Sequence, residues 1–341
     1  MDSKSYPLDF SIIVPVLNEE RHIDICFSAI AGLKTPVDRY EVMLIDNGST
    51  DRTLALAGEY ANRFNLVIYS KPGIHISAMR NFGVSKARGK ILAFLDADCI
   101  VSDQWLNHAR QTFQRELVAP RGGALPAIAG AAYQIPPDST WVAKAWNINA
   151  SNLPVAGPVA WIPSGNMFVE REAFFAVGGF NENIQTNEDY DLCQRIRARG
   201  YSVISDPEIA VVHVGTPQDI SSFFRKEHWH GKDVFKVYLE SGRTMKNSKA
   251  VAFALFYAAL LAGFVFAGIV TAITGRFIFL EMCLLFAFCV PVALAIKVSF
   301  AAGQYRHICG LSVLYTVYGI ARAFCIFKVS TGVFQAPPTV S

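Results

Sequence analysis

Two aspartates, Asp96 and Asp98, are separated only by Ala97 and follow directly on the apolar run 90–95. Two carboxylates that flank a small residue at the end of a strand can hold a hard divalent cation. Mg²⁺ in particular usually binds one or two protein carboxylates together with substrate phosphates. The same residues also fit a solvated loop after a strand, because so short a pattern often occurs by chance. The surrounding sequence must therefore decide between the two interpretations.

Other candidate groups stand next to predicted elements. Asp46 ends the apolar run 40–45, and Glu188 and Asp189 open a polar stretch with a helical pattern. Taken alone, Asp189 fits a carboxylate placed at a helix N-terminus, where the helix dipole favours negative charge. His213 follows a predicted short strand. A lone histidine is more often a structural group with its hydrogen bonds satisfied.

Short apolar runs alternate with helical patterns through the first hundred residues. We expect strands over 10–17, 40–45, 66–69 and 90–95, and helices over 19–33, from 49 or 50 to 64, and up to about 87. Asn18 is expected to cap the first helix. This alternation predicts a parallel sheet covered on both faces. Such sheets bind ligands beyond the carboxyl ends of their strands, so Asp46, Asp96 and Asp98 are expected near one edge.

The glycine-rich loops that often bind nucleotides on such a sheet are missing from the sequence. No GxGxxG follows the first predicted strand, and no GxxxxGK[ST] occurs anywhere. A bound diphosphate would need another source of positive charge. A metal ion on Asp98 would supply it.

Seven short motifs, taken jointly and in order, resemble those of the family 2 glycosyltransferases. They lie at 11–19 (SIIVPVLNE), 45–51 (IDNGSTD), 78–83 (AMRNFG), 94–98 (FLDAD), 164–166 (SGN), 178–180 (GGF) and 188–192 (EDYDL). The resemblance covers about residues 10–215. It implies an α/β fold of the GT-A type, the nucleotide-diphospho-sugar transferase fold with a mixed central sheet, followed here by C-terminal transmembrane helices.

The resemblance also implies roles for single residues. The residues expected to bind the nucleotide-sugar are Pro15, Asn18, Glu19, Asp46, Arg80, Asp96 and Gly165. Within this set, Asp46 would hydrogen-bond the base and Arg80 would lie near the base or the phosphates. Asp96 would contact the ribose or the sugar.

A metal site and a general base follow from the same resemblance. Asp98 is expected to bind a divalent cation, Mg²⁺ or Mn²⁺, and His213 to complete the site. Asp189 is expected to deprotonate the acceptor hydroxyl, with Glu188 as the alternative for that role. The implied reaction is an inverting single displacement at the anomeric carbon, in which the metal stabilises the leaving diphosphate.

One departure from the family pattern concerns whether the enzyme is processive. Processive polysaccharide synthases of this family carry Gln-x-x-Arg-Trp after the catalytic base, whereas the corresponding stretch here, 224–230, reads FRKEHWH. The apolar part of the chain is also small for a polymer channel. We therefore expect a non-processive enzyme that adds a single sugar.

The composition indicates a membrane-attached protein. Hydrophobic residues make up 52% of the 341 residues, the mean hydropathy is +0.28, and the excess lies in 250–328. The stretches 250–275 and 277–296 are long enough to span a bilayer. The stretch 310–327 contains Arg322 and fits either a third span or a helix along the interface. The net charge of +3 gives no basis for nucleic-acid binding, and seven scattered cysteines without CxxC predict no disulfide framework and no zinc site.

Four ranges are expected: a GT-A catalytic domain at 1–218, an amphipathic interface segment at 219–249, a membrane region with two or three helices at 250–330, and a tail at 331–341. Arg243, Lys246 and Lys249 precede the first span. The positive-inside rule then predicts a multi-pass protein of the inner (plasma) membrane with its catalytic domain in the cytoplasm. The basic amphipathic segment fits docking onto anionic membrane lipids.

We therefore expect a hexosyltransferase that uses a nucleotide-sugar, UDP being the commonest nucleotide of the family. Its acceptor would be a hydroxyl on a glycan or a lipid-linked molecule, in exopolysaccharide or other cell-envelope glycan assembly. Two alternatives stay open. A sugar nucleotidyltransferase would need a glycine-rich phosphate loop, and a non-enzymatic membrane scaffold with a degenerate fold would lack the carboxylates.

Overall fold

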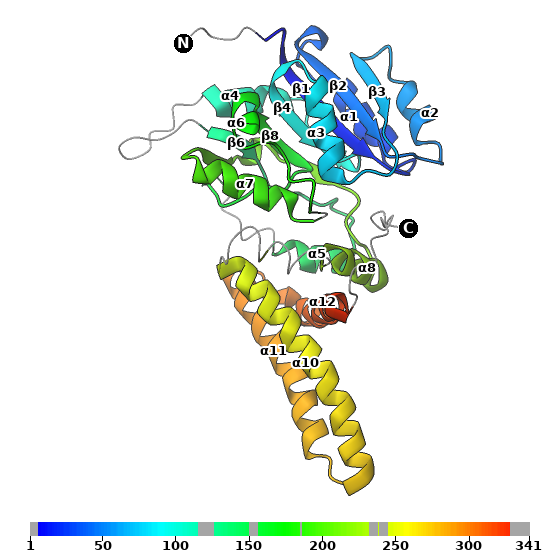
Figure 1. Cartoon of the computed structure of the whole chain (residues 1–341), viewed down its shortest axis with the longest axis vertical. Coiled ribbons are helices and arrows are strands. Elements are labelled where there is room, and N and C mark those ends of the chain that lie inside the picture. Colours follow the sequence, from blue (N-terminus) through cyan, green and yellow to red (C-terminus); the bar gives the residue numbers. More distant parts are fainter. Residues whose placement is uncertain are drawn as a thin grey trace. The chain divides into compact units, whose positions relative to one another are not determined.

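The structure is a computed structural model that describes residues 6–114, 126–149, 156–184, 186–231, 238 and 245–327. The chain folds into two compact units (Figure 1). The first consists of Met1–Pro136 and Leu153–Thr216, and the second of Pro137–Asn152 and Pro217–Ser341. A short piece from the middle of the sequence thus belongs to the second unit. The four predicted ranges stay predictions.

A mixed sheet of eight strands forms the centre of the first unit. Its strands lie in the order β3 (Leu66–Ser70), β2 (Tyr40–Asp46), β1 (Leu8–Val16), β4 (Gly89–Leu95), β8 (Asn166–Glu170), β6 (Pro126–Gly130), β9 (Ser202–Ser205) and β7 (Gly157–Pro158). The first four are parallel to one another, and β8 runs antiparallel to both β4 and β6. The four predicted strands are all present, with small shifts at their ends.

Helices cover both faces of this sheet (Figure 1). Ile12 and Val14 of β1 enter a core with α1 (Ile23–Ala31), α2 (Thr53–Gly58) and α4 (Trp105–Gln114). Ile13 points the other way, into a core with α3 (Ile76–Lys86), α6 (Arg171–Ala176) and α7 (Glu188–Ala198). Successive side chains of a strand alternate between faces. Burial on both faces therefore explains why β1 reads as a continuous apolar run.

The first helix begins later than its pattern predicts. α1 starts at Ile23 with His22 at its N-cap, whereas Asn18 has a left-handed φ of 56° and lies before it. The prediction that Asn18 caps this helix is therefore wrong. Its side-chain oxygen instead accepts a hydrogen bond from the backbone N–H of Thr50, at 2.9 Å.

A second, very small sheet matters more for the chemistry. β5 (Cys99–Ile100) pairs antiparallel with β10 (Val212–His213), so that His213 lies opposite Cys99. Gln134 forms a bridge to Val212 on the same strand. This pairing brings the end of the first unit's chain to the loop that follows β4.

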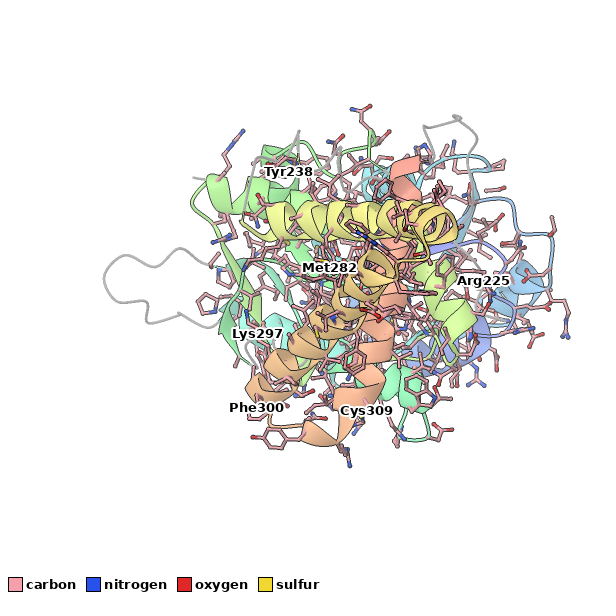
Figure 2. The ribbon with its side chains drawn as sticks, turned by 90° about the horizontal axis from the view of Figure 1, so that it is seen from below. Arg225, Tyr238, Met282, Lys297, Phe300 and Cys309 are labelled. Atoms are coloured by element: carbon pink, nitrogen blue, oxygen red, sulfur yellow. The ribbon has the colours of Figure 1, made fainter. Side chains whose placement is uncertain are left out.

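The second unit is helical. It contains α5 (Trp141–Asn147), α8 (Ile220–Gly231), α10 (Met245–Thr274), α11 (Ile278–Ala301) and α12 (Ile308–Phe327). Among the described residues, three stretches are long and apolar enough to cross a membrane: Val251–Thr274, Ile278–Ala301 and Tyr305–Cys325. These three helices are the C-terminal apolar elements that the sequence predicts, and Figure 2 shows them from below.

Candidate active site

Asp46 ends β2 and holds the turn that follows it. The side chain is buried, and its two carboxylate oxygens accept hydrogen bonds from the backbone N–H groups of Gly48 and Ser49, each at 3.0 Å. An aspartate often folds the backbone in this way at the start of a turn. Asp46 thereby fixes the shape of the loop beyond β2.

The loops after β1 and β2 are tied to each other through the residues predicted to line the nucleotide pocket. Pro15 lies in β1 opposite Ile45 of β2. The N–H of Asn18 donates to the Ser49 hydroxyl at 2.9 Å, and the N–H of Glu19 donates to the Thr53 hydroxyl at 2.7 Å. The structure therefore places Pro15, Asn18 and Glu19 side by side with the Asp46 loop.

Arg80 is the buried centre of an ion-pair network. It lies on α3 with 2% of its surface exposed. Its Nη2 donates to Asp96 Oδ1 at 2.9 Å, and its Nη1 donates to Glu188 Oε1 at 2.7 Å. Burial opposes the charge, but the two carboxylates outweigh it and raise the pKa of Arg80. Ser164 also donates to Glu188 Oε1, at 3.1 Å, so this oxygen accepts two hydrogen bonds within the protein.

Gly165 is required by the close approach of two other residues. A Cβ at this position would overlap Asp96 Oδ2 and the Tyr133 hydroxyl. The backbone also approaches closely, because Asp96 N–H donates to the Gly165 carbonyl at 3.2 Å. Gly165 thus leaves the space that the second carboxylate oxygen of Asp96 occupies.

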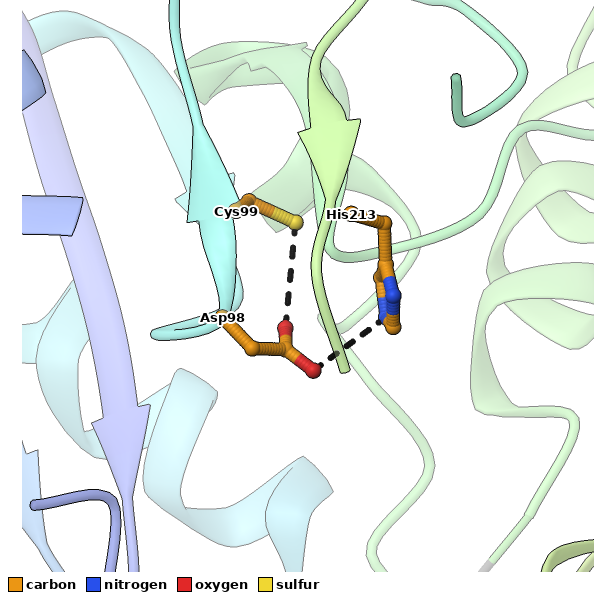
Figure 3. Close-up of side chains that lie close together, drawn as sticks. All are labelled: Asp98, Cys99 and His213. Atoms are coloured by element: carbon orange, nitrogen blue, oxygen red, sulfur yellow. Dashed lines mark hydrogen bonds and ion pairs between the residues drawn. The ribbon is translucent and has the colours of Figure 1, made fainter. Parts of the chain in front are cut away.

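Asp98, Cys99 and His213 form the cluster that could hold a metal ion (Figure 3). His213 Nε2 lies 3.3 Å from Asp98 Oδ2, and Cys99 Sγ lies 3.8 Å from Asp98 Oδ1. The three potential ligand atoms all lie within 4.8 Å of one another. A Cβ on Gly215 would overlap Asp98 Oδ2, so this glycine leaves the space that the carboxylate occupies.

Neighbouring groups fix the orientation of His213. The strand pairing holds its backbone, and its Nδ1 lies 3.2 Å from the Thr216 hydroxyl. The Tyr133 ring packs on the imidazole with centroids 4.6 Å apart. A partner on one ring nitrogen is the usual arrangement for a histidine that binds a metal through the other.

Tyr133 is a site residue that the sequence did not suggest. Its hydroxyl lies 3.5 Å from Asp96 Oδ2. Burial, followed by the charges of Asp96, Cys99, Asp98 and Asp189, raises its pKa well above the ordinary value. The phenol therefore stays protonated at neutral pH and can donate a hydrogen bond. Its only sequence signal is a tyrosine in an irregular stretch, because the bridge from Gln134 to Val212 that places it is long-range.

Asp189 lies in the first turn of α7, next to Glu188. It is half-buried, and its Oδ1 accepts the backbone N–H of Tyr190 at 2.7 Å. Its neighbour Glu188 pairs with Arg80, which also pairs with Asp96. The structure thus brings Asp189 to the same region as the predicted metal ligands.

Negative charge accumulates in this region. Burial raises the pKa of Glu19; a hydrogen bond from His22 lowers it, and the charges of Asp98 and Asp96 raise it further. The single buried guanidinium of Arg80 is shared between Asp96 and Glu188. A divalent cation would relieve the repulsion that remains.

Comparison with known proteins gives one consistent result. Residues 11–173 match the sequence model of the family described as glycosyl transferase family 2. The glycosyltransferase AglE of Haloferax volcanii is 26% identical over 249 residues, which cover 71% of this chain and 78% of that protein. A beta-monoglucosyldiacylglycerol synthase of Nostoc sp. is 27% identical over 227 residues, which cover 64% of this chain and 47% of that protein.

Solved structures agree on the fold. The mannosyltransferase PcManGT from Pyrobaculum calidifontis, in complex with GDP-Man and Mn²⁺, superposes with a TM-score of 0.55 at 19% identity, covering 91% of this chain and 87% of that chain. The GT-A fold predicted from the motifs is therefore confirmed, as is the predicted glycosyltransferase. The family match ends at residue 173, so Asp189 and His213 lie beyond it.

Proposed function

Because this chain is a family 2 glycosyltransferase, we propose that it transfers a hexosyl group from a nucleotide-diphosphate sugar to an acceptor hydroxyl, with inversion at the anomeric carbon. The observation that carries the proposal is that Asp98 contacts His213, while Arg80 joins Asp96 to Glu188, the neighbour of Asp189. Pro15, Asn18, Glu19 and Asp46 form the adjoining loops in which the nucleotide would bind.

The residues present fit a divalent cation. Asp98 and His213 would hold it, since a carboxylate oxygen and an imidazole nitrogen lie 3.3 Å apart and Thr216 contacts the other ring nitrogen. A carboxylate together with an imidazole suits Mn²⁺, and Mg²⁺ favours oxygen ligands. The bound metal would neutralise the charge of the departing nucleoside diphosphate.

The donor would be bound by residues whose positions are already fixed. Asp96 has one oxygen on Arg80 and directs the other towards Tyr133. The second oxygen can also accept a hydroxyl of the ribose or the sugar. We propose a UDP-sugar as donor, on the resemblance to the family.

Asp189 is the better candidate for the general base. The Glu188 carboxylate accepts hydrogen bonds from Arg80 and Ser164, and it is buried. A base must reach the proton that it removes. Asp189 is half-buried, so it is more accessible to an acceptor hydroxyl than the buried Glu188 is.

We also propose a lipid-linked or membrane glycan acceptor. The chain carries three helices that could cross a membrane, and basic residues precede the first of them. The name of the Nostoc relative describes a monoglucosyldiacylglycerol product, which supports an acceptor in the membrane. The positive-inside rule supports a catalytic unit on the cytoplasmic side of the plasma membrane.

Turnover with a panel of nucleotide-sugars tests this proposal. Membranes containing the wild-type chain are compared with Asp98→Asn, each with Mn²⁺ or with EDTA. We expect release of nucleoside diphosphate from one donor, lost in EDTA and reduced at least 100-fold by Asp98→Asn.

Asp103→Asn is the matched control, because Asp103 lies in the same loop region but pairs with Lys34 at the surface. It should turn over the donor at the wild-type rate. Full turnover by Asp98→Asn in EDTA would contradict the proposal.

A further inference from the structure

The last of the three apolar helices differs from the other two. α10 and α11 lie side by side along the long axis of Figure 1, whereas α12 is seen close to end-on. Figure 2, turned by 90°, shows α12 running across both of them. Each candidate span contains an 18-residue apolar segment. Inside the protein, 33% of this segment is buried in α12, 22% in α10 and 11% in α11. Other elements therefore cover more of α12 than of α11.

Near its start, α12 is covered by α5. Gly310 packs against the Trp141 ring so closely that a Cβ would lie 3.1 Å from it. One turn further, the Tyr315 hydroxyl donates to Asn149 Oδ1 at 2.7 Å. Trp146 of α5 packs edge-on against Tyr315, with ring centroids 5.7 Å apart. The first half of α12 thus lies along a short helix that comes from a distant part of the sequence.

Towards its end, α12 is covered by α8. Arg322 Nη2 donates to Glu227 Oε2 at 2.8 Å, and both side chains are largely buried. The guanidinium also lies 4.8 Å from the centroid of the Tyr318 ring. Cys325 Sγ donates to the His228 carbonyl at 3.1 Å. Arg322, the charge that made this stretch a doubtful span, is paired with an acid from a different helix.

The helices that cover α12 cannot lie in hydrocarbon. Lys144 on α5 and Arg225 on α8 are exposed (Arg225 is labelled in Figure 2), and charged side chains in a bilayer core are costly and rare. The contacts from Gly310 to Cys325 extend over ~22 Å of helix at 1.5 Å per residue. If α12 crossed the bilayer, α5 and α8 would have to enter it with their charges.

The uncovered face of α12 is narrow and apolar. Among the α12 residues up to Cys325, whose burial the structure describes, the exposed ones of this kind are Cys309, Val313 and Phe324. Their spacing of 4 and 11 places them on one stripe of a helix. α10 and α11, by contrast, expose large apolar side chains such as Phe266 and Phe288 along their length. Lys297, labelled in Figure 2 near the end of α11, marks where that helix returns to a polar environment.

We propose that α10 and α11 form a two-span hairpin and that α12 lies flat along the membrane interface, with its stripe of Cys309, Val313 and Phe324 against lipid. α5 and α8 cover its opposite face with their charges in water. The chain then crosses the membrane twice. The residues before α10 and the residues after α12 lie on the same side.

Labelling with a membrane-impermeant maleimide decides between two and three crossings. Single cysteines are introduced by Arg276→Cys between α10 and α11, by Arg306→Cys between α11 and α12, and by Ser341→Cys, in the full chain with its seven native cysteines replaced. Right-side-out and inside-out vesicles are compared. The first two variants are controls, because they must label from opposite sides in either arrangement.

The proposal expects Ser341→Cys to label from the same side as Arg306→Cys. Labelling from the side of Arg276→Cys would show a third crossing and overturn the proposal. Depth measurement gives a second test, with nitroxide labels attached through Val313→Cys and Phe324→Cys. A flat α12 places both labels at one depth, whereas a crossing helix separates them by ~16 Å.

Discussion

Asp189→Asn and Glu188→Gln replace neighbouring carboxylates on α7 by amides of similar shape, and they should fail in different ways. Asp189 is half-buried, and the buried Glu188 accepts hydrogen bonds from Arg80 and Ser164. If Asp189 is the base, its amide cannot take the acceptor proton. General acid–base groups contribute about 10²–10⁴ in rate, which at 1.36 kcal/mol per tenfold is about 3–5 kcal/mol of barrier.

Glu188→Gln should act on stability first. Arg80 would keep its ion pair with Asp96 but lose the negative charge 2.7 Å away, although its side chain is only 3% exposed. Breaking a buried pair by neutralising one member costs about 3–5 kcal/mol, and the low end applies because the glutamine oxygen still accepts a hydrogen bond. For a unit of this size, a loss of about 3 kcal/mol lowers the melting temperature by roughly 6–12 °C.

The assay measures kcat for sugar transfer, donor binding and thermal unfolding for both variants. Asp189→Asn should lose kcat, keep donor binding and melt near the wild type. Asp191→Asn is a control on the same helix, because its carboxylate is held by Arg195 at 2.6 Å, and it should leave kcat nearly unchanged. Wild-type kcat in Asp189→Asn, with kcat lost in a folded Glu188→Gln, would refute the assignment.

Three further outcomes follow from contacts in the site. Gly165→Ala should fold but lower kcat/KM about 100-fold, because the new Cβ would displace the Asp96 carboxylate by a shift of ångström scale. A wild-type kcat/KM would show that Asp96 need not stay in place. Tyr133→Phe should raise KM for the donor less than tenfold, since only one long hydrogen bond of 3.5 Å to Asp96 is lost. Steady-state kinetics measure both constants, and an effect on kcat larger than the effect on KM would contradict this prediction. The hydrogen bond to Glu19 raises the pKa of His22 above its ordinary 6.5, although burial opposes this rise. The protonated His22 therefore stabilises the fold fully below pH 6.5, and this stabilisation is lost as the pH rises through the raised pKa. Melting curves at several pH values should show that His22→Gln removes this loss of stability, and a variant with the wild-type pH dependence would contradict the assignment.

The parts of the fold that were predicted correctly are those that depend on local sequence. The strands around Ile12 and Ile45 were predictable because burial on both faces leaves a continuous apolar run in the sequence. The position of Asp96 and Asp98 at the edge of the sheet was predictable as well, since residues that follow parallel strands lie at one edge. Asn18 was misplaced as a helix cap because its actual partner, Thr50, belongs to the next loop along the sheet.

What could not be predicted depends on contacts between distant residues. Tyr133 reaches the site only because a bridge joins Gln134 to Val212, and no local pattern in that irregular stretch indicates it. In the sequence, Arg322 is an unexplained charge within an apolar segment. Only the structure shows that it pairs with Glu227 on another helix. Local propensity contains no information about such pairings.

Calorimetric titration of nucleoside diphosphate tests the central claim most directly, namely that Asp98 and His213 hold the metal that binds the donor's diphosphate. UDP is titrated into the purified full-length protein with Mn²⁺ or with EDTA, for the wild type and for Asp98→Asn. We expect the wild type to bind UDP with Mn²⁺, and to bind it at least tenfold more weakly in EDTA; Asp98→Asn should bind at least tenfold more weakly as well. Equal affinity under all four conditions would contradict it.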